Sequence, residues 1–252
     1  MMETLSHTIE LPSKIHHFPT HHNLGNSVLG TPIGYFTVGH GSKQILIMSG
    51  LHGDEFEAQI LLDAIFRELI TTQHFARYFE SWTIAILPVA NPDGAHLRQR
   101  WNANLVDLNR NFPTKDWNPA PLKPRYTPGP APASEPETKN IITLIKGHRP
   151  ILVLDIHSFQ TSAVLPCLPS KNRFPCDGDL LDHLIKRLAH NLHVPIGDEV
   201  LGYETAGGKH TWCQEQGIPE ITLEVKRNIN HQEIVERYLG PTILFLDDFL
   251  HA

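Results

Sequence analysis

Cysteine is scarce in this chain, with three cysteines among 252 residues. Cys167, Cys176 and Cys213 form an odd set without the spacing of a disulfide framework, and none of them belongs to a Cys-x-x-Cys pair. We therefore expect free thiols in a reducing compartment. The same spacing argues against a zinc site built from thiolates.

Long basic runs and long apolar runs are also missing. No stretch is rich in Lys and Arg, and the formal net charge of −6 argues against a nucleic-acid partner. No apolar run approaches the roughly 18 residues that cross a bilayer, so no membrane partner is expected. Residues 1–7 lack the basic start and apolar core of a secretory signal. These absences together predict a cytoplasmic protein.

The composition is that of an ordinary globular protein, with 40% hydrophobic and 19% charged residues. The length allows a substantial core in one α/β domain. Strand-like and helix-like segments alternate along the chain, which predicts a mixed, mainly parallel central sheet with helices on both faces. We expect residues 1–252 to form a single domain, in which residues 1–30 are a polar, His-rich and irregular segment.

The individual elements follow from hydrophobic periodicity and turn residues. The first two strands are joined through Gly39-His-Gly41 and are expected to form a hairpin. Residues 91–132 have the pattern of a long loop, which in a compact domain usually serves function. Ser134 and Glu137 have the spacing of a capping box at a helix start. We predict strands at 35–38, 44–48, 82–87, 151–156 and 219–225, helices at 54–70, 179–191 and 207–216, and a closing segment at 232–250.

Three separated residues predict a metal site. His52 and Glu55 follow an apolar strand, beside the turn made by Gly50 and Gly53, and His157 follows a second apolar strand. Open α/β sheets place their sites at the carboxyl ends of strands, so these side chains are expected to meet there. Two His and one Glu, with an open fourth position, form one ligand set of catalytic zinc. The sequence therefore predicts one bound Zn²⁺, although another divalent ion would also fit.

Two further segments carry polar side chains suited to a substrate. Asn109 and Arg110 lie side by side, and the planar guanidinium of Arg fits a carboxylate through two parallel hydrogen bonds. Glu224 is the one carboxylate in the apolar run 221–225. Burying a bare carboxylate is costly, so Glu224 must be paired, protonated or functional.

The chain resembles the zinc carboxypeptidase superfamily of metallopeptidases from about residue 50 to residue 225, with motifs in the family's order. The resemblance implies the fold of these enzymes, a zinc cofactor and hydrolysis of a small peptide substrate. It assigns the metal ligands to His52, Glu55 and His157. It assigns the clamp for the substrate carboxylate to Asn109 and Arg110.

The resemblance also implies catalytic and supporting roles. Glu224 matches the general base, and Tyr203 matches the mobile Tyr that closes over the substrate. Arg100 matches the Arg that polarises the scissile carbonyl, with Arg98 as a rival. Asp107 matches the carboxylate that fixes the imidazole tautomer of the first metal-binding His.

Within the superfamily, the chain looks closest to the small bacterial murein peptide amidases, which cut the γ-D-glutamyl–diaminopimelate bond of cell-wall peptides. Such an enzyme would recycle peptidoglycan fragments. One departure is the pair Lys209 and His210, in the segment expected to floor the pocket for the leaving residue. We expect both to contact the substrate and to favour a polar or charged leaving residue over an aromatic one. The matching segments are 91–94, 102–104, 106–113, 134–138, 212–213 and 221–224.

Three other functions stay open. An N-acyl amino acid deacylase of the aspartoacylase and succinylglutamate desuccinylase type shares the metal set and an Asn-Arg pair, although segments 91–94 and 212–213 favour a peptidase. A conventional metallocarboxypeptidase would use Lys209 and His210 as a basic pocket for acidic residues. A non-catalytic ligand-binding module is the least favoured, because every expected catalytic residue has a match here.

Overall fold

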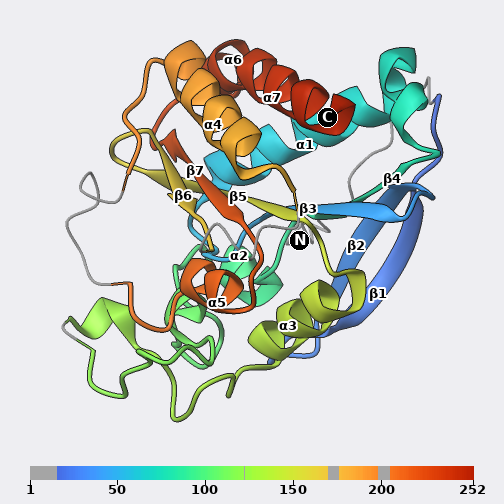
Figure 1. Ribbon diagram of the computed structural model, residues 1–252. Helices are drawn as coiled ribbons and strands as arrows, with labels where there is room; N and C mark the ends of the chain where they lie inside the picture. Colours follow the sequence, from blue (N-terminus) through green and yellow to red (C-terminus); the bar gives the residue numbers. More distant parts are fainter. Residues whose placement is uncertain (1–15, 122, 170–175, 198–204) are drawn as a thin grey trace, which may run out of the picture.

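One mixed sheet organises the residues that the computed structural model describes, namely 16–121, 123–169, 176–197 and 205–252. Its spatial order is β1-β2-β4-β3-β5-β7-β6 (Figure 1). Strands run parallel in the centre, from β4 through β3 and β5 to β7, and antiparallel at both edges. The strands are β1 (Thr20–Asn26), β2 (Pro32–Gly39), β3 (Lys43–Ser49), β4 (Trp82–Leu87), β5 (Leu152–Phe159), β6 (Ala163–Cys167) and β7 (Glu220–Lys226).

Helices cover both faces of the sheet, as its buried parallel centre requires. Helices α1, α4, α6 and α7 lie on one side, and α2, α3 and α5 lie on the other (Figure 1). This arrangement confirms the mixed α/β fold expected from the sequence. The helices are α1 (Phe56–Thr71), α2 (Pro92–Leu97), α3 (Pro136–His148), α4 (Gly178–Leu192), α5 (Lys209–Glu215), α6 (His231–Ile234) and α7 (Gly240–His251), with short 3-10 helices at Gln73–Tyr78, Leu108–Arg110 and Pro124–Tyr126 and a π-helical turn at Val235–Leu239.

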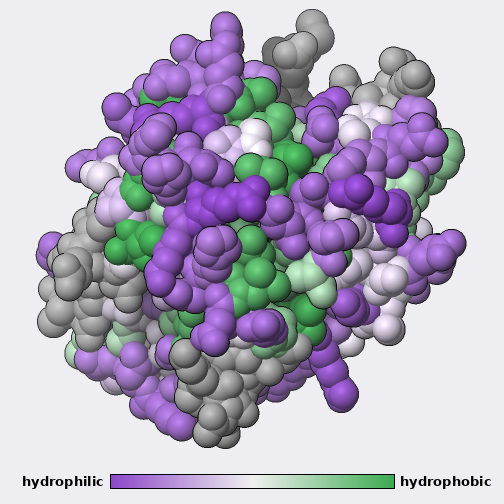
Figure 2. Space-filling model, turned by 45° about the horizontal axis from the view of Figure 1, so that its top comes forward, coloured by the Kyte–Doolittle hydropathy of each residue, from purple (hydrophilic) through white to green (hydrophobic). Residues whose placement is uncertain are grey.

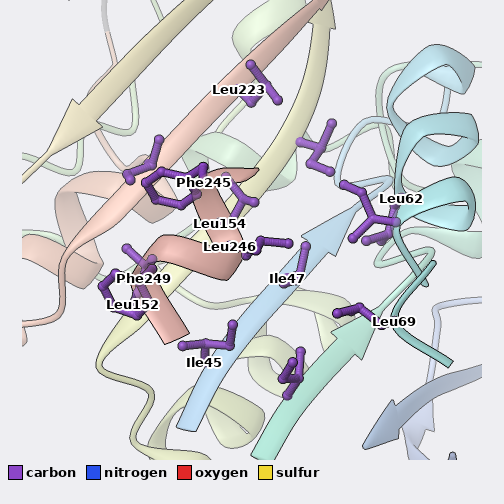
Figure 3. Packing of buried hydrophobic residues seen from close by; sticks show 14 of the residues in the cluster. Ile45, Ile47, Leu62, Leu69, Leu152, Leu154, Leu223, Phe245, Leu246 and Phe249 are labelled. Carbon is purple, nitrogen blue, oxygen red and sulfur yellow. The ribbon is translucent and has the colours of Figure 1, made fainter. Parts of the chain in front are cut away.

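The core has two layers because the side chains of a strand alternate between the faces of the sheet. In β3, Ile45 and Ile47 face the larger cluster, which includes residues of α1, α4 and α7 (Figure 3). Leu46 and Met48 face the smaller cluster, which includes residues of α3 and α5. A strand buried on both faces therefore appears in the sequence as a continuous apolar run.

The outer surface is mainly polar on the side of α4, α6 and α7. Figure 2 shows this side obliquely, with hydrophilic residues predominating and hydrophobic residues visible between them. In the part of the chain that the structure describes, no helix is both long and apolar enough to cross a membrane.

The expected hairpin between the strands at 35–38 and 44–48, which are β2 and β3, is wrong. Strand β2 pairs with β1 and β4, whereas β3 pairs with β4 and β5, so β2 and β3 are separated in the sheet. The turn at Gly39 instead packs against the residue before β4, where a Cβ on Gly41 would meet the Ser81 backbone at 1.8 Å. The irregular segment expected at 1–30 is corrected as well, because it contains β1.

Two smaller expectations are also wrong. Ser134 does not cap α3, whose N-cap residue is Glu135 without a side-chain bond; Ser134 instead donates to the Glu135 carboxylate. Glu137 accepts from Val28 N and Asn102 Nδ2, so it ties the N-terminal segment to the loop before the helix. The expected long loop at 91–132 contains α2 and two short 3-10 helices, and β6 is additional to the strands expected from the sequence.

Candidate metal centre and active site

The turn between β3 and α1 positions the first two ligands. Strand β3 ends at Ser49, and Gly50 takes a positive φ of 66° that favours glycine. At Gly53, a Cβ would meet the backbone of Gly94 at 2.0 Å, so the turn packs directly against α2. His52 and Glu55 are thereby held at the carboxyl end of the sheet, before α1 begins at Phe56.

Parallel strands β5 and β7 bring two more functional side chains to the same place. His157 lies in β5, which continues past it to Phe159, and it is paired in register with Glu224 of β7. Both residues are nearly fully buried, at 3% and 5% exposure. The third ligand therefore comes from a strand rather than from a loop, so its position is set by the sheet.

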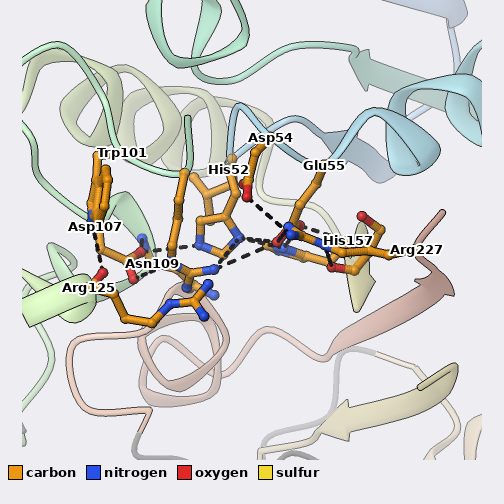
Figure 4. A network of polar contacts seen from close by, with 12 residues as sticks. His52, Asp54, Glu55, Trp101, Asp107, Asn109, Arg125, His157 and Arg227 are labelled. Carbon is orange, nitrogen blue, oxygen red and sulfur yellow. Dashed lines mark hydrogen bonds and ion pairs between the residues drawn. The ribbon is translucent and has the colours of Figure 1, made fainter. Parts of the chain in front are cut away.

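The three ligand residues form a compact buried cluster. One ligand atom from each of His52, Glu55 and His157 can be chosen so that all lie within 4.8 Å of one another. The two Nδ1 atoms are 3.2 Å apart, and each lies beside a carboxylate oxygen of Glu55, at 2.9 Å and 2.8 Å (Figure 4). Two imidazole nitrogens and a carboxylate, buried and convergent, fit a zinc ion with an open coordination position.

Each imidazole is held from its other side by a carboxylate. His52 Nε2 lies 3.2 Å from Asp107, and His157 Nε2 lies 2.9 Å from Asp155. Such partners fix the tautomer, so that the opposite nitrogen is free to bind a metal. Burial would raise the pKa of Asp107, but Arg100 and His52 outweigh it and lower the pKa well below its usual range.

Sequence reasoning missed two supports of the ligands. Asp155 stands two residues before His157 and therefore on the same face of β5, a signal that strand periodicity could have provided. Arg227, just after β7, places Nη2 3.1 Å from Glu55 and Nη1 3.1 Å from Asp54 (Figure 4). Its role could not be read from the sequence, because it depends on how the end of β7 meets the β3–α1 turn.

A cavity opens beside the ligands and contains most of the expected site residues. Within it, burial raises the pKa of Glu224 to about 8, although His157 opposes the shift. Among the described residues, Glu224 Oε2 is buried without a hydrogen-bond partner, so this oxygen is available to bind a molecule in the cavity. The lining residues are His52, Glu55, Arg100, Asn109, Arg110, His157, Phe159, Leu165, Cys167, Thr205, His210, Thr222 and Glu224.

The two rival arginines lie in different places. Arg100 is buried and lines the cavity, with Nε 2.9 Å from Asp107 and Nη1 3.3 Å from His52 Nδ1. Arg98 is exposed and lies over the ring of Phe56, 5.8 Å from its centroid. Arg100 therefore has access to the metal side of the cavity, and Arg98 is not among the lining residues.

The expected carboxylate clamp also lies in the cavity. Asn109 and Arg110 belong to a 3-10 turn that is capped by Asp107, whose Oδ1 accepts from Asn109 N at 3.0 Å. Arg110 is buried, and its guanidinium lies 4.9 Å from the centroid of the Tyr126 ring. Asn109 Oδ1 accepts a hydrogen bond from Lys209 N at 2.9 Å, which orients the amide.

The contact of Lys209 with substrate is not supported by its position. Lys209 is 1% exposed and lies outside the cavity lining, with Nζ 2.8 Å from Glu220 and 3.2 Å from Asp155. His210, the next residue along α5, does line the cavity. Tyr203 falls outside the described residues.

Comparison with known proteins identifies the family. The model of the family described as zinc carboxypeptidase matches residues 6–239. Murein peptide amidase A of Escherichia coli is 31% identical over 233 residues, which cover 88% of this chain and 87% of that protein. Murein peptide amidase A of Vibrio campbellii is 32% identical, with 88% and 85% covered.

Solved structures agree with this assignment. The crystal structure of murein-tripeptide amidase from Escherichia coli superposes with a TM-score of 0.69 at 27% identity, covering 94% of this chain and 93% of the other. Bovine thrombin-activatable fibrinolysis inhibitor shares the fold, with a TM-score of 0.75 at 18% identity and coverage of 92% and 89%. The chain therefore belongs to the zinc carboxypeptidase family and is a metallopeptidase whose zinc site is formed by His52, Glu55 and His157.

Proposed function

We propose that this metallopeptidase hydrolyses an amide bond next to a residue with a free carboxylate, and that its substrate is the γ-D-glutamyl–diaminopimelate bond of murein tripeptide. The observation that carries the proposal is the cavity in which Asn109 and Arg110 stand beside the zinc ligands and Glu224. The similarity to murein peptide amidases over 88% of the chain supports the choice of substrate.

Zinc bound at the three ligands would supply Lewis-acid chemistry, activating a water molecule and polarising the scissile carbonyl. Glu224 is proposed as the general base, which accepts the proton of the attacking water and returns it to the leaving amine. Its burial and its position opposite His157 support this role, and in the metal-free protein burial raises its pKa. A bound divalent cation would lower that pKa again, towards the ionised form that a base needs.

Arg100 is proposed to stabilise the negative charge that develops on the carbonyl oxygen. Its guanidinium is fixed by Asp107 and lies against His52, so it needs no reorganisation when the charge appears. An interaction that strengthens as charge develops lowers the barrier rather than merely tightening substrate binding.

Asn109 and Arg110 are proposed to hold the carboxylate of the leaving residue. Arg110 sits in a buried position against Tyr126, where an arginine–carboxylate pair is stronger than in open water. Fixing the carboxylate fixes the distance between the scissile bond and the metal, which removes an entropic part of the barrier. Tyr203 is proposed to close over the bound substrate.

The remaining lining favours a polar leaving residue. His210, Thr205 and Thr222 contribute polar groups to the cavity, next to the apolar Leu165 and Phe159. Diaminopimelate carries an amino and a carboxyl group at the far end of its side chain, which such groups could bind. An aromatic side chain in the same place offers no hydrogen-bonding group to this lining, so we expect it to be disfavoured.

The proposal is tested by offering the zinc-loaded protein a panel of substrates and identifying the products by mass. The panel contains L-Ala-γ-D-Glu-diaminopimelate, N-acyl amino acids and ordinary peptides. We expect release of diaminopimelate from the tripeptide as the fastest reaction. Preferred cleavage of N-acyl amino acids would indicate a deacylase instead, and preferred trimming of ordinary peptides would indicate a conventional carboxypeptidase.

A further inference from the structure

A line of buried polar residues runs from the middle of the sheet to the metal centre. On β5, Asp155 and His157 share one face, and on the neighbouring β7, Glu220 and Glu224 share the same side through their register with β5. All are at most 5% exposed. Charged side chains are almost never fully buried unless they are paired, so each member of this line calls for a partner.

Lys209 supplies the missing positive charge. Its Nζ lies 2.8 Å from Glu220 Oε2 and 3.2 Å from Asp155 Oδ2, and the same Asp155 oxygen lies 2.9 Å from His157 Nε2. The buried sequence of contacts is therefore Glu220–Lys209–Asp155–His157, and it ends at a zinc ligand. Burial would lower the pKa of Lys209, but Asp155 and Glu220 outweigh it and raise the pKa, which keeps the ammonium charged.

The orientation of the Asp155 carboxylate depends on its contacts with Lys209 and His157. Among the described residues, Asp155 Oδ1 is buried without a hydrogen-bond partner, so both contacts of the carboxylate are made by Oδ2. With Lys209 removed, His157 would be the only one of the described residues holding Oδ2 in place. A carboxylate oxygen held by two partners loses much of its rotational freedom before any metal binds.

A contribution to stability alone does not explain why the charges of Lys209, Asp155 and Glu220 are buried. Replacing a buried ion-pair network by apolar residues of similar volume is often neutral or stabilising for the fold. By contrast, residues that orient metal ligands typically contribute 10–100-fold to metal affinity. The cost of burial is therefore better explained by what the network does to His157 than by stability.

We propose that Lys209 is a positioning residue of the zinc centre, which holds Asp155 against His157 Nε2 so that Nδ1 is presented to the metal. Glu220 balances the charge of Lys209 and keeps it in place. Lys209 also donates its backbone N–H to Asn109, so one residue of α5 links the metal ligand and the carboxylate clamp. The side-chain part of this arrangement can be tested separately, because a substitution leaves the backbone N–H intact.

The decisive variant is the double substitution Lys209→Met with Glu220→Gln. It removes one positive and one negative charge together, so the net charge of the buried line does not change. Zinc dissociation constants are measured by competition with a chelator, and thermal unfolding of the metal-free protein is recorded alongside. Lys186→Met is the matched control, because Lys186 pairs with Asp182 on the exposed side of α4.

We expect the double variant to bind zinc about 10–100-fold more weakly than the wild type, with the metal-free proteins unfolding at similar temperatures. Lys186→Met should retain wild-type affinity, since it keeps the contact between Lys209 and Asp155. Wild-type zinc affinity in a folded double variant would overturn the proposal, because it would show that Lys209 only neutralises Glu220.

Asp155→Asn provides a second, independent test, which also applies if the double variant does not fold. It leaves the Lys209–Glu220 pair neutral, and it should weaken zinc binding by a similar factor. Unchanged affinity in this variant would overturn the proposal. These measurements use zinc binding without substrate, so their outcome is separate from that of the proposed amidase activity.

Discussion

At the scale of single residues, each imidazole of the metal centre is oriented by a carboxylate at Nε2, while its Nδ1 faces the metal site. His52 is held by Asp107 and His157 by Asp155, and Glu55 is held in turn by Arg227. A metal ligand with its own partner loses less freedom on binding, which strengthens the site without adding ligands. The chemistry of the centre therefore depends on residues that never touch the metal.

Replacement of Glu224 by Gln should abolish most of the activity. The amide keeps the shape of the side chain but cannot accept the proton of the attacking water, so kcat should fall by at least about a hundredfold. Zinc content should stay at the wild-type level, because Glu224 is not among the three ligands. Near-normal turnover in this variant would remove Glu224 from the role of general base.

Replacement of His157 by Ala should remove the metal. The variant loses one of three ligands and leaves Asp155 without its imidazole partner, so zinc measured after dialysis should fall well below one ion per chain. His193→Ala is a suitable control, because His193 ends α4 on the surface. Equal zinc content in wild type and His157→Ala would contradict the ligand assignment.

The sequence was informative about which residues carry chemistry and less informative about where they point. The ligands were predicted from a local His-x-x-Glu spacing and a strand-end His, which are short-range features. Lys209 and His210 were both expected in the pocket because their segment matches the one that floors it in the amidases, yet adjacent residues of a helix point about 100° apart. Whether a helical side chain faces a cavity or a sheet depends on how the helix packs, and a single sequence does not reveal that packing.

At the scale of elements, the site depends on three chain segments that meet at the carboxyl ends of parallel strands. The β3–α1 turn provides two ligands, β5 provides the third, and β7 provides Glu224. The expected strands correspond to β2, β3, β4, β5 and β7, whereas β1 and β6 were not expected. The expected pairing of β2 with β3 is wrong because β4 lies between them in the sheet. The turn residues between two strands do not reveal that a third strand from later in the sequence pairs with both.

The β3–α1 turn should be intolerant of any side chain at Gly53. A Cβ there would meet the Gly94 backbone at 2.0 Å, so Gly53→Ala must push the turn away from α2. We expect a loss of about 1–3 kcal/mol in the free energy of unfolding, together with weaker zinc binding.

Gly147→Ala is the matched control for this substitution. Gly147 lies within α3, and a Cβ there would meet nothing within 4 Å, so this change should stabilise the protein by up to about 1 kcal/mol. Chemical denaturation of both variants measures the two effects. Equal stability of Gly53→Ala and wild type would show that the close approach of the turn to α2 has no energetic consequence.

At the scale of the whole molecule, zinc joins distant parts of the chain. Its ligands come from positions 52, 55 and 157, so bound metal joins parts of the chain that are far apart in the sequence. Zinc binds the folded state in preference to the unfolded state, and with zinc at 100 times its dissociation constant the stabilisation is about 2.7 kcal/mol.

Removal of zinc should therefore lower the unfolding temperature by roughly 5–10 °C for a chain of this size. Calorimetry of zinc-loaded and chelator-treated protein measures the difference, and readdition of zinc should restore it. An unchanged unfolding temperature after verified loss of the metal would show that the ligands are not joined by it in the folded state.

The central claim is that the site recognises a free carboxylate next to the bond that it cuts. The most direct measurement compares kcat/KM for L-Ala-γ-D-Glu-diaminopimelate with kcat/KM for the same peptide amidated on the carboxylate nearest the scissile bond. Loss of a charged hydrogen-bonded pair with Arg110 should lower kcat/KM for the amide by at least about tenfold. Cleavage of the amide as fast as the free acid would contradict the account.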